Sequence, residues 1–183
     1  MQALVGANLI DGTGGPVVND ATVLIDGERI KAVGPRGAVI LPPNTGVVDL
    51  SGLTLLPGLI DCHDHLASRN YDLASRWGLS EPASLRHLRV AKTLEQTLAS
   101  GYTCVRDAAW LDAGFKQAVE EGLYPGPRLV LSVVIISPTG GLGDHICPAG
   151  HRRPFHTDPL LPSGVADGVD AVRAKVRELV RVG

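Results

Sequence analysis

The sequence predicts an α/β protein in which a short β-rich segment precedes alternating strands and helices. Residues 1–54 hold short alternating or β-branched stretches that are separated by turn residues. Residues 55–183 repeat a strand, a loop and a helix three times. Such alternation is typical of a parallel sheet with helical crossovers. We therefore expect a partial β-sandwich segment over 1–54 and three βα units over 55–183.

The first segment contains several short strand patterns. Thr22–Ile25 and Arg29–Val33 flank Asp26-Gly27, which predicts a hairpin with a two-residue loop. Val47–Leu50 predicts one more short strand. A strict alternation near the N-terminus predicts a half-buried strand, with its apolar residues at Ala3, Val5, Ala7 and Leu9. Because this segment is too small to bury a core by itself, we expect it to need a partner sheet.

Three strands are predicted in the second segment, at Leu59–His65, Tyr102–Asp107 and Leu129–Ile136. The third is rich in Val and Ile, as expected for a parallel strand covered on both faces. Cys62 and Cys104 lie within these strands and are expected to be buried. No Gly-x-Gly-x-x-Gly follows the first strand, which argues against an open dinucleotide-binding sheet and favours a barrel. A closed barrel needs eight βα units, so three units predict an incomplete (β/α)8 barrel with open strand edges.

Three helices are predicted between and after these strands. The first starts at Ser80-Glu81-Pro82 and ends at Gly101, with an apolar face at Leu85, Leu88, Ala91, Leu94 and Leu98. The second covers Asp112–Glu121 and is closed by Gly122. Asp167 is expected to cap the third, whose apolar face is Val169, Val172, Val176, Leu179 and Val180.

Composition excludes several functional classes. The chain has 183 residues and a net charge of -2, with 17 basic and 19 acidic side chains, which argues against a nucleic-acid partner. No apolar run approaches the roughly 18 residues of a membrane span, and the N-terminus lacks the pattern of a secretory signal. We therefore expect no membrane association and a cytoplasmic location.

Two histidines on the first strand are the strongest candidates for chemistry. His63 and His65 are two positions apart, so both side chains would project from the same face of a β-strand. Two neutral imidazoles so placed make half of a divalent-metal site, although unrelated core or surface histidines also show this spacing. Asp61 would lie one layer deeper on that face and orient a ligand. Asp107, at the end of the second strand, could orient a ligand histidine or a substrate amine, cap a helix, or pair with Arg106.

The loop after the third strand offers a second group of candidates. Thr139, Gly140, Gly141 and Asp144 belong to a glycine-rich loop whose backbone N–H groups could approach a substrate. Several ionisable residues follow, but their spacing fits neither one strand face nor one helix face, which favours ordinary loop positions for His145, His151, His156, Arg152 and Arg153.

These motifs together resemble the amidohydrolase superfamily of metal-dependent hydrolases. The resemblance runs through Leu55–Leu66, Gly101–Asp107, Gly126–Arg128, Ser137–Asp144 and the last helix. It is nearest to the branch of prolidase-like dipeptidases and relatives of imidazolonepropionase. It implies a metal-dependent hydrolase barrel, with His63 and His65 as ligands of one or two divalent ions, most simply zinc. The implied reaction is hydrolysis of an amide, cyclic amide or dipeptide-like C–N bond by a metal-activated water. Relatives often carry histidine where this chain has Leu142, which puts the usual substrate preference in doubt.

The resemblance covers only the N-terminal portion of the family's barrel. The family's later site residues (a strand-four lysine, histidines on strands five and six, and a strand-eight aspartate) would all follow Gly183. The chain alone is therefore expected to hold no catalytic residue and to be inactive, and whether it is itself an enzyme stays open. A small amide or dipeptide-like substrate is expected, together with a homo-oligomer or a complementing C-terminal chain. The alternative is a non-catalytic relic or interaction module that self-associates through its open strand edges.

Overall fold

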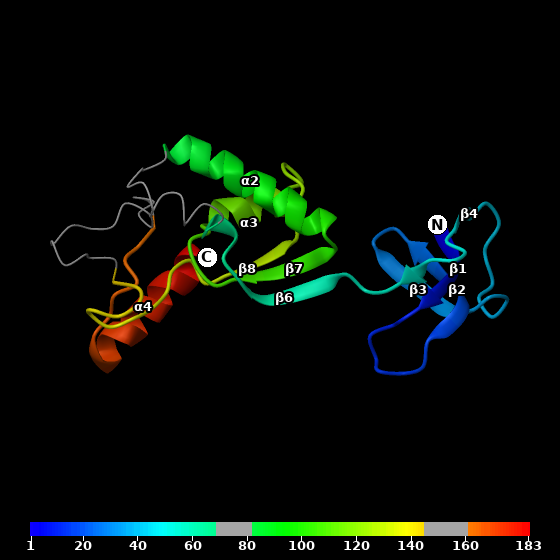
Figure 1. Cartoon of the computed structure of the whole chain (residues 1–183), viewed down its shortest axis with the longest axis horizontal. Coiled ribbons are helices and arrows are strands. Elements are labelled where there is room, and N and C mark those ends of the chain that lie inside the picture. Colours follow the sequence, from blue (N-terminus) through cyan, green and yellow to red (C-terminus); the bar gives the residue numbers. More distant parts are fainter. Residues whose placement is uncertain (69–81, 145–160) are drawn as a thin grey trace. The chain divides into compact units, whose positions relative to one another are not determined.

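The computed structural model describes residues 1–68, 82–144 and 161–183. It has a mixed α/β fold with two compact units, residues 1–57 and 58–183. The boundary falls between Pro57 and Gly58, whereas the sequence places it after residue 54. Each unit is described by itself below, with the element labels of Figure 1.

The first unit is built around one central strand. Its sheet has the order β3-β2-β1-β4, and β5 also pairs with β1. β1 runs antiparallel to β2 and parallel to β4 and β5. Every second residue of β1 is buried, which confirms the predicted alternation of Ala3, Val5, Ala7 and Leu9. The strands are β1 (Gln2–Leu9), β2 (Val18–Asp26), β3 (Arg29–Pro35), β4 (Gly46–Asp49) and β5 (Thr54–Leu55).

The hairpin between β2 and β3 turns one residue later than predicted. Asp26 pairs with Arg29, so the two-residue loop is Gly27-Glu28 instead of Asp26-Gly27. Gly27 has a φ of 59°, a left-handed conformation that glycine adopts without a steric penalty. Asp26 is thus the last residue of the strand, and its carboxylate lies 3.6 Å from the Lys31 ammonium.

The second unit contains a three-stranded parallel sheet of order β6-β7-β8. The strands are β6 (Leu59–Asp64), β7 (Tyr102–Asp107) and β8 (Arg128–Leu131). The described α-helices are α2 (Ala83–Ala99), α3 (Ala113–Glu120) and α4 (Gly168–Val182), and a short 3-10 turn, η1 (Leu66–Ser68), follows β6. The parallel pairing confirms the expected strand–helix alternation.

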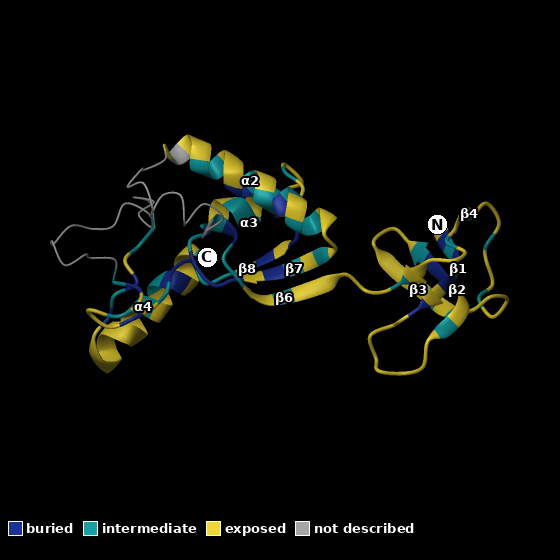
Figure 2. Ribbon diagram, viewed as in Figure 1, coloured by how far each residue is buried: buried dark blue, intermediate teal, exposed yellow. Residues whose placement is uncertain are grey.

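The main core of this unit lies between the sheet and two helices. α2 and α3 cover one face of the sheet (Figure 1). The buried cluster combines Val105 and Leu129 of the sheet with Val90 and Leu94 of α2, and it is completed by Leu66 and Leu111 from the turns after β6 and β7. Figure 2 shows the β6 ribbon largely in the exposed colour. Cys62 on this strand is exposed and Cys104 on β7 is half-buried, so the expectation that both are buried is wrong.

The third strand is shorter than predicted. β8 ends at Leu131 rather than Ile136, because Val133 adopts a left-handed conformation with a φ of 65°. A left-handed residue interrupts the regular ladder of a strand. The chain turns there, and the Ser132 amide donates to the Asp107 carbonyl at 3.0 Å.

The predicted apolar face of α2 is partly wrong. Leu88 is 70% exposed, whereas Val90 and Leu94 are buried at 4% and 1%. The face of α2 that packs on the sheet is therefore rotated away from Leu85 and Leu88. Which face is buried depends on how the helix docks against the sheet. Pro82 precedes the helix without a side-chain cap, and Ser80 and Glu81 lie outside the described residues.

α4 departs from its prediction in two ways. Asp167 stands at the N-cap position, but its carboxylate makes no capping hydrogen bond and instead binds Thr139. Only Leu179 of the predicted apolar face is buried, while Val169 and Val180 are 66% and 77% exposed. No helix in the described ranges is long and apolar enough to cross a membrane.

Candidate metal centre

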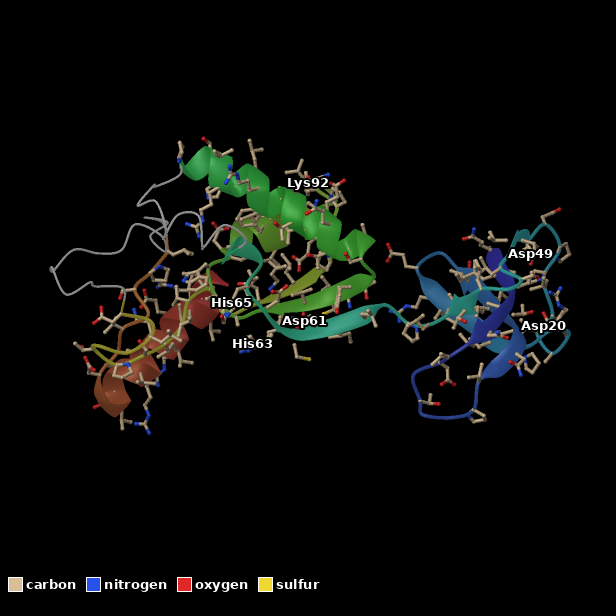
Figure 3. The ribbon with its side chains drawn as sticks, viewed as in Figure 1. Asp20, Asp49, Asp61, His63, His65 and Lys92 are labelled. Carbon is tan, nitrogen blue, oxygen red and sulfur yellow. The ribbon has the colours of Figure 1, made fainter. Side chains whose placement is uncertain are left out.

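The two candidate ligands lie at the carboxyl end of β6. Figure 3 shows His63 and His65 there, with Asp61 further back along the strand. The imidazole centroids of His63 and His65 are 5.2 Å apart, and the ring planes meet at 81°. His63 is exposed and His65 is half-buried. The structure therefore brings the two predicted ligands together, with one ring reachable from solvent.

Neighbouring carboxylates fix the backbone that carries these rings. The Asp61 Oδ1 atom accepts the His63 amide at 2.9 Å, and the Asp64 Oδ1 atom accepts the His65 amide at 2.7 Å. The pairing of β6 with β7 is irregular between Asp61 and Asp64. Side chains do not simply alternate between the two faces of a strand at such an irregularity. The two aspartate side chains therefore provide hydrogen bonds to the backbone where the regular pairing with β7 is interrupted.

The environment of His65 favours the neutral imidazole. Burial lowers its pKa most, and the nearby His63 lowers it further, while the charge of Asp64 raises it. Metal ions bind the neutral form, so this shift favours ligation. The His65 Nδ1 atom is also buried and has no hydrogen-bond partner among the described residues. Such an unsatisfied buried atom costs about 1–3 kcal/mol, a cost that a bound cation or its hydration would relieve.

Two imidazoles supply only part of a metal site. Structural and catalytic zinc sites use three or four protein ligands, and within residues 1–68, 82–144 and 161–183 no group of three His, Cys, Asp or Glu side chains could hold a metal. His63 and His65 fit a divalent cation in donor type and proximity. The remaining ligands would have to come from elsewhere.

Asp107 is fully buried at the last position of β7. Burial raises the pKa of its carboxyl to about 7, and the charge of Asp64 adds to this shift, although amide donors from Leu66, Leu111 and Ala109 oppose it. Asp107 does not cap α3, because Asp112 occupies that position and accepts the Gly114 amide.

Arg106 does not contact Asp107 through any hydrogen bond described here. Its Nη1 group donates instead to the Cys62 carbonyl at 3.3 Å. The pairing alternative for Asp107 is therefore not favoured, and its carboxylate instead receives backbone amides at the end of the sheet that holds His65.

Asp61 faces a different environment from the histidine rings. Its side chain and that of Asp64 line a cavity of about 280 Å³, together with Tyr102 on β7 and residues around the C-terminal half of α2, which are Thr93, Gln96, Thr97 and Ser100. Its hydrogen bond is to the His63 backbone amide, and the predicted role of Asp61 in orienting a ligand stays a prediction.

The glycine-rich loop uses its amides internally. Thr139 donates its N–H and its hydroxyl to Asp167, and the Gly140 amide donates to Asp144 at 2.9 Å. The Gly141 amide donates to the Pro138 carbonyl. Among described residues these four candidates are thus tied to one another and to the start of α4, rather than hydrogen-bonded to His63 or His65. His145, His151, His156, Arg152 and Arg153 lie outside the described residues.

Trp110 is a site residue that the sequence patterns did not indicate. Its indole lies against the His65 ring, with centroids 5.1 Å apart and planes inclined by 34°. Its φ is 78°, which is unusual for a bulky residue and costs about 1–3 kcal/mol. No composition or spacing rule predicts such a conformation at a tryptophan, and the only available signal was an aromatic residue just after a strand end.

Comparison with known proteins places this chain in a family. The profile of the Amidohydrolase family matches residues 54–183. Ochratoxinase from Aspergillus niger is 32% identical over 193 aligned residues, which cover 96% of this chain and 38% of the relative. Imidazolonepropionase from Rubrobacter xylanophilus is 47% identical over 55 residues, which cover 28% of this chain and 13% of the relative.

Solved structures give the same result. A prolidase in complex with N-methylphosphonate-L-proline superposes with a TM-score of 0.81 at 36% identity, over 98% of this chain and 44% of that one. The structure of A. niger ochratoxinase gives a TM-score of 0.78 at 29% identity over the same shares, 98% and 44%. The chain thus spans less than half the length of these relatives. The profile match over most of the sequence shows that this chain belongs to the Amidohydrolase family.

Proposed function

We propose that this chain supplies the N-terminal part of a metal-dependent hydrolase that cleaves a C–N bond. The observation that carries this proposal is the pair of adjacent imidazoles, His63 and His65, at the carboxyl end of a parallel strand. Active sites of barrels built from such strands lie at that end. The family match supports the same assignment.

We further propose that residues 1–54 form half of a β-sandwich, and that residues 55–183 form the first three βα units of an incomplete (β/α)8 barrel. The parallel order β6-β7-β8 supports this assignment. So do the relatives, which match this chain over 38–44% of their own length.

His63 and His65 would hold the metal, which we propose to be zinc, in one or two ions. A divalent cation in such a site activates water and polarises a carbonyl. The chain's own residues then have supporting tasks. Asp61 and Asp64 hold the amides of the two histidines, and burial lowers the pKa of His65, which favours its neutral imidazole. The proton-transfer group and the other ligands belong to the complete protein, so we expect no turnover by this chain alone.

The substrate class is proposed from the relatives. They include a prolidase, ochratoxinases and imidazolonepropionases. A small amide, cyclic amide or dipeptide-like molecule is therefore the proposed substrate. The uncovered face of β6 and the exposed valines of α4 are where further chain, covalent or complementing, would pack.

The test is zinc binding to the purified chain. Zn²⁺ titration followed by calorimetry should give a dissociation constant that rises at least tenfold in His63→Ala and in His65→Ala, because each variant removes one of two ligands.

His87→Ala serves as the matched control, since His87 lies on α2 against Phe115 and outside the site. It should bind zinc as the unmodified chain does. If His63→Ala and His65→Ala also bind zinc unchanged, the proposed function is wrong. Concentration-dependent self-association without zinc binding would then favour the interaction-module alternative.

A further inference from the structure

Asp107 is a carboxylate where an apolar side chain would be expected. It is 0% exposed, and it lies beside the apolar cluster that includes Val105 and Leu111. Burying a carboxylate is unfavourable unless hydrogen bonds compensate it. Its presence therefore requires contacts that an apolar side chain could not make.

Those contacts join two strand ends. The Oδ2 atom accepts the Leu66 amide at 2.8 Å, across 41 positions of sequence. The Oδ1 atom accepts the Ala109 amide at 3.1 Å. The Leu111 backbone amide also donates to this carboxylate. Leu66 directly follows His65. One side chain thus ties the residue after His65, the half-buried candidate ligand, to the turn that follows β7.

The main chain of β7 reinforces this junction. The Ala108 amide donates to the Asp64 carbonyl at 2.7 Å, and the Ser132 amide donates to the Asp107 carbonyl at 3.0 Å. The ends of β6, β7 and β8 are therefore linked around Asp107.

The turn held by Asp107 carries Trp110. Trp110 has a φ of 78°, and its amide donates to the Val133 carbonyl at 2.8 Å. Val133 is left-handed as well, with a φ of 65°. A tryptophan and a valine leave their preferred conformations only where surrounding contacts hold them. The result is that the indole lies 5.1 Å from the His65 ring, centroid to centroid.

We propose that Asp107 is a positioning residue for the metal site: its carboxylate fixes the chain after His65 to the Trp110 turn, so that the His65 imidazole is held against the indole. The effect on metal affinity rests on the function proposed above, but the effect on ring orientation does not. A ring oriented before the cation arrives binds it more tightly, because less freedom is lost on ligation.

The first experiment uses the metal-free chain. Amide hydrogen exchange by NMR should show the Leu66 and Ala109 amides protected at least 100-fold over the exposed amide of Leu142, and nuclear Overhauser contacts should join the His65 and Trp110 rings. Exchange of the Leu66 amide at the rate of the Leu142 amide would overturn the proposal, without the need for any variant.

The second experiment uses Asp107→Asn, which keeps one acceptor oxygen but replaces the other with a donor. We expect the His65–Trp110 contacts to weaken and the Zn²⁺ dissociation constant to rise about 10- to 100-fold, as for other residues that support a ligand. Asp112→Asn is the matched control, because Asp112 also accepts one backbone amide, that of Gly114, and should leave both readouts unchanged.

Unchanged ring contacts and unchanged zinc affinity in a folded Asp107→Asn protein would overturn the proposal. If the unmodified chain binds no zinc, the proposed function fails, while hydrogen exchange and ring contacts still decide the positioning role. If Asp107→Asn does not fold, the exchange rates of the unmodified chain remain the deciding measurement.

Discussion

The two units of this protein place left-handed residues in different ways. In the first unit the non-glycine residues with positive φ are Asp20 and Asn44, at 49° and 62°. Asp and Asn tolerate this conformation. Among the described residues of the second unit they are Trp110 and Val133, at 78° and 65°, a bulky and a β-branched residue for which this conformation is unfavourable. The backbone strain of the described chain is therefore concentrated at the strand ends beside His65.

Charge is also distributed differently between the units. In the first unit the Asp20 carboxylate meets Arg36 at 2.8 Å, with the two side chains 55% and 53% exposed. A pair of this kind contributes at most about 1 kcal/mol. In the second unit the Asp107 carboxyl is fully buried. The first unit thus has the pattern of a scaffold, whereas the second contains an unfavourably buried carboxyl and strained backbone around its candidate site.

The largest expected effect is on the pH dependence of the second unit. Burial raises the pKa of Asp107 to about 7 in the folded chain, from an ordinary value of 3.8. Between these two pH values the folded state therefore holds a proton that the unfolded state releases. The contribution of Asp107 to the free energy of unfolding is then highest below pH 4 and falls as pH rises to about 7, by up to about 4 kcal/mol. Urea denaturation between pH 4 and 8 should show this fall, and Asp107→Asn should remove it.

His65 changes the free energy of unfolding in the opposite direction with pH, so its contribution must be separated from that of Asp107. Its lowered pKa means that the unfolded chain gains a proton below about pH 6.5 that the folded chain resists, so stability rises with pH through that window. The difference between the unmodified chain and Asp107→Asn cancels this contribution. If the free energy of unfolding changed with pH in the same way for the unmodified chain and for Asp107→Asn, the prediction would be contradicted.

A smaller effect tests whether the two units unfold separately. Leu94 on α2 is 1% exposed in the core of the second unit, and Leu94→Ala should lower the free energy of unfolding of that unit by about 3 kcal/mol. The first unit should keep its own transition in denaturant.

Leu88→Ala provides the control for this substitution, because Leu88 is on the same helix but 70% exposed. Its expected effect is within about 0.5 kcal/mol. A loss of stability in both units on Leu94→Ala would show that the two units unfold together, which would contradict this prediction.

The smallest effect concerns the left-handed residues of the first unit. Asn44→Val should destabilise that unit by about 1–2 kcal/mol, because a β-branched side chain is disfavoured at a φ of 62°. Asn44→Gly should be neutral or slightly stabilising by thermal denaturation. Equal stabilities of the Val and Gly variants would show that this turn relaxes freely, unlike the one at Trp110.

Local sequence patterns predicted most elements and both ligand candidates. Alternation located β1, and Gly101 and Gly122, with φ values of 94° and 70°, end α2 and α3 as predicted. The errors have a common cause. The length of β8, the buried stripe of α2 and the burial of Cys62 all depend on how a segment docks against others, which a local pattern does not encode.

The sequence by itself determined the order of strands and helices, and it placed two imidazoles on one strand end, because periodicity and turn chemistry act over a few residues. Only the tertiary structure decided that the Asp107 carboxylate reaches the Leu66 amide, 41 residues away, and that Trp110 turns left-handed to meet His65. Contacts of this kind form when separate strands meet, and the strain they impose is sustained by the packing of the whole unit.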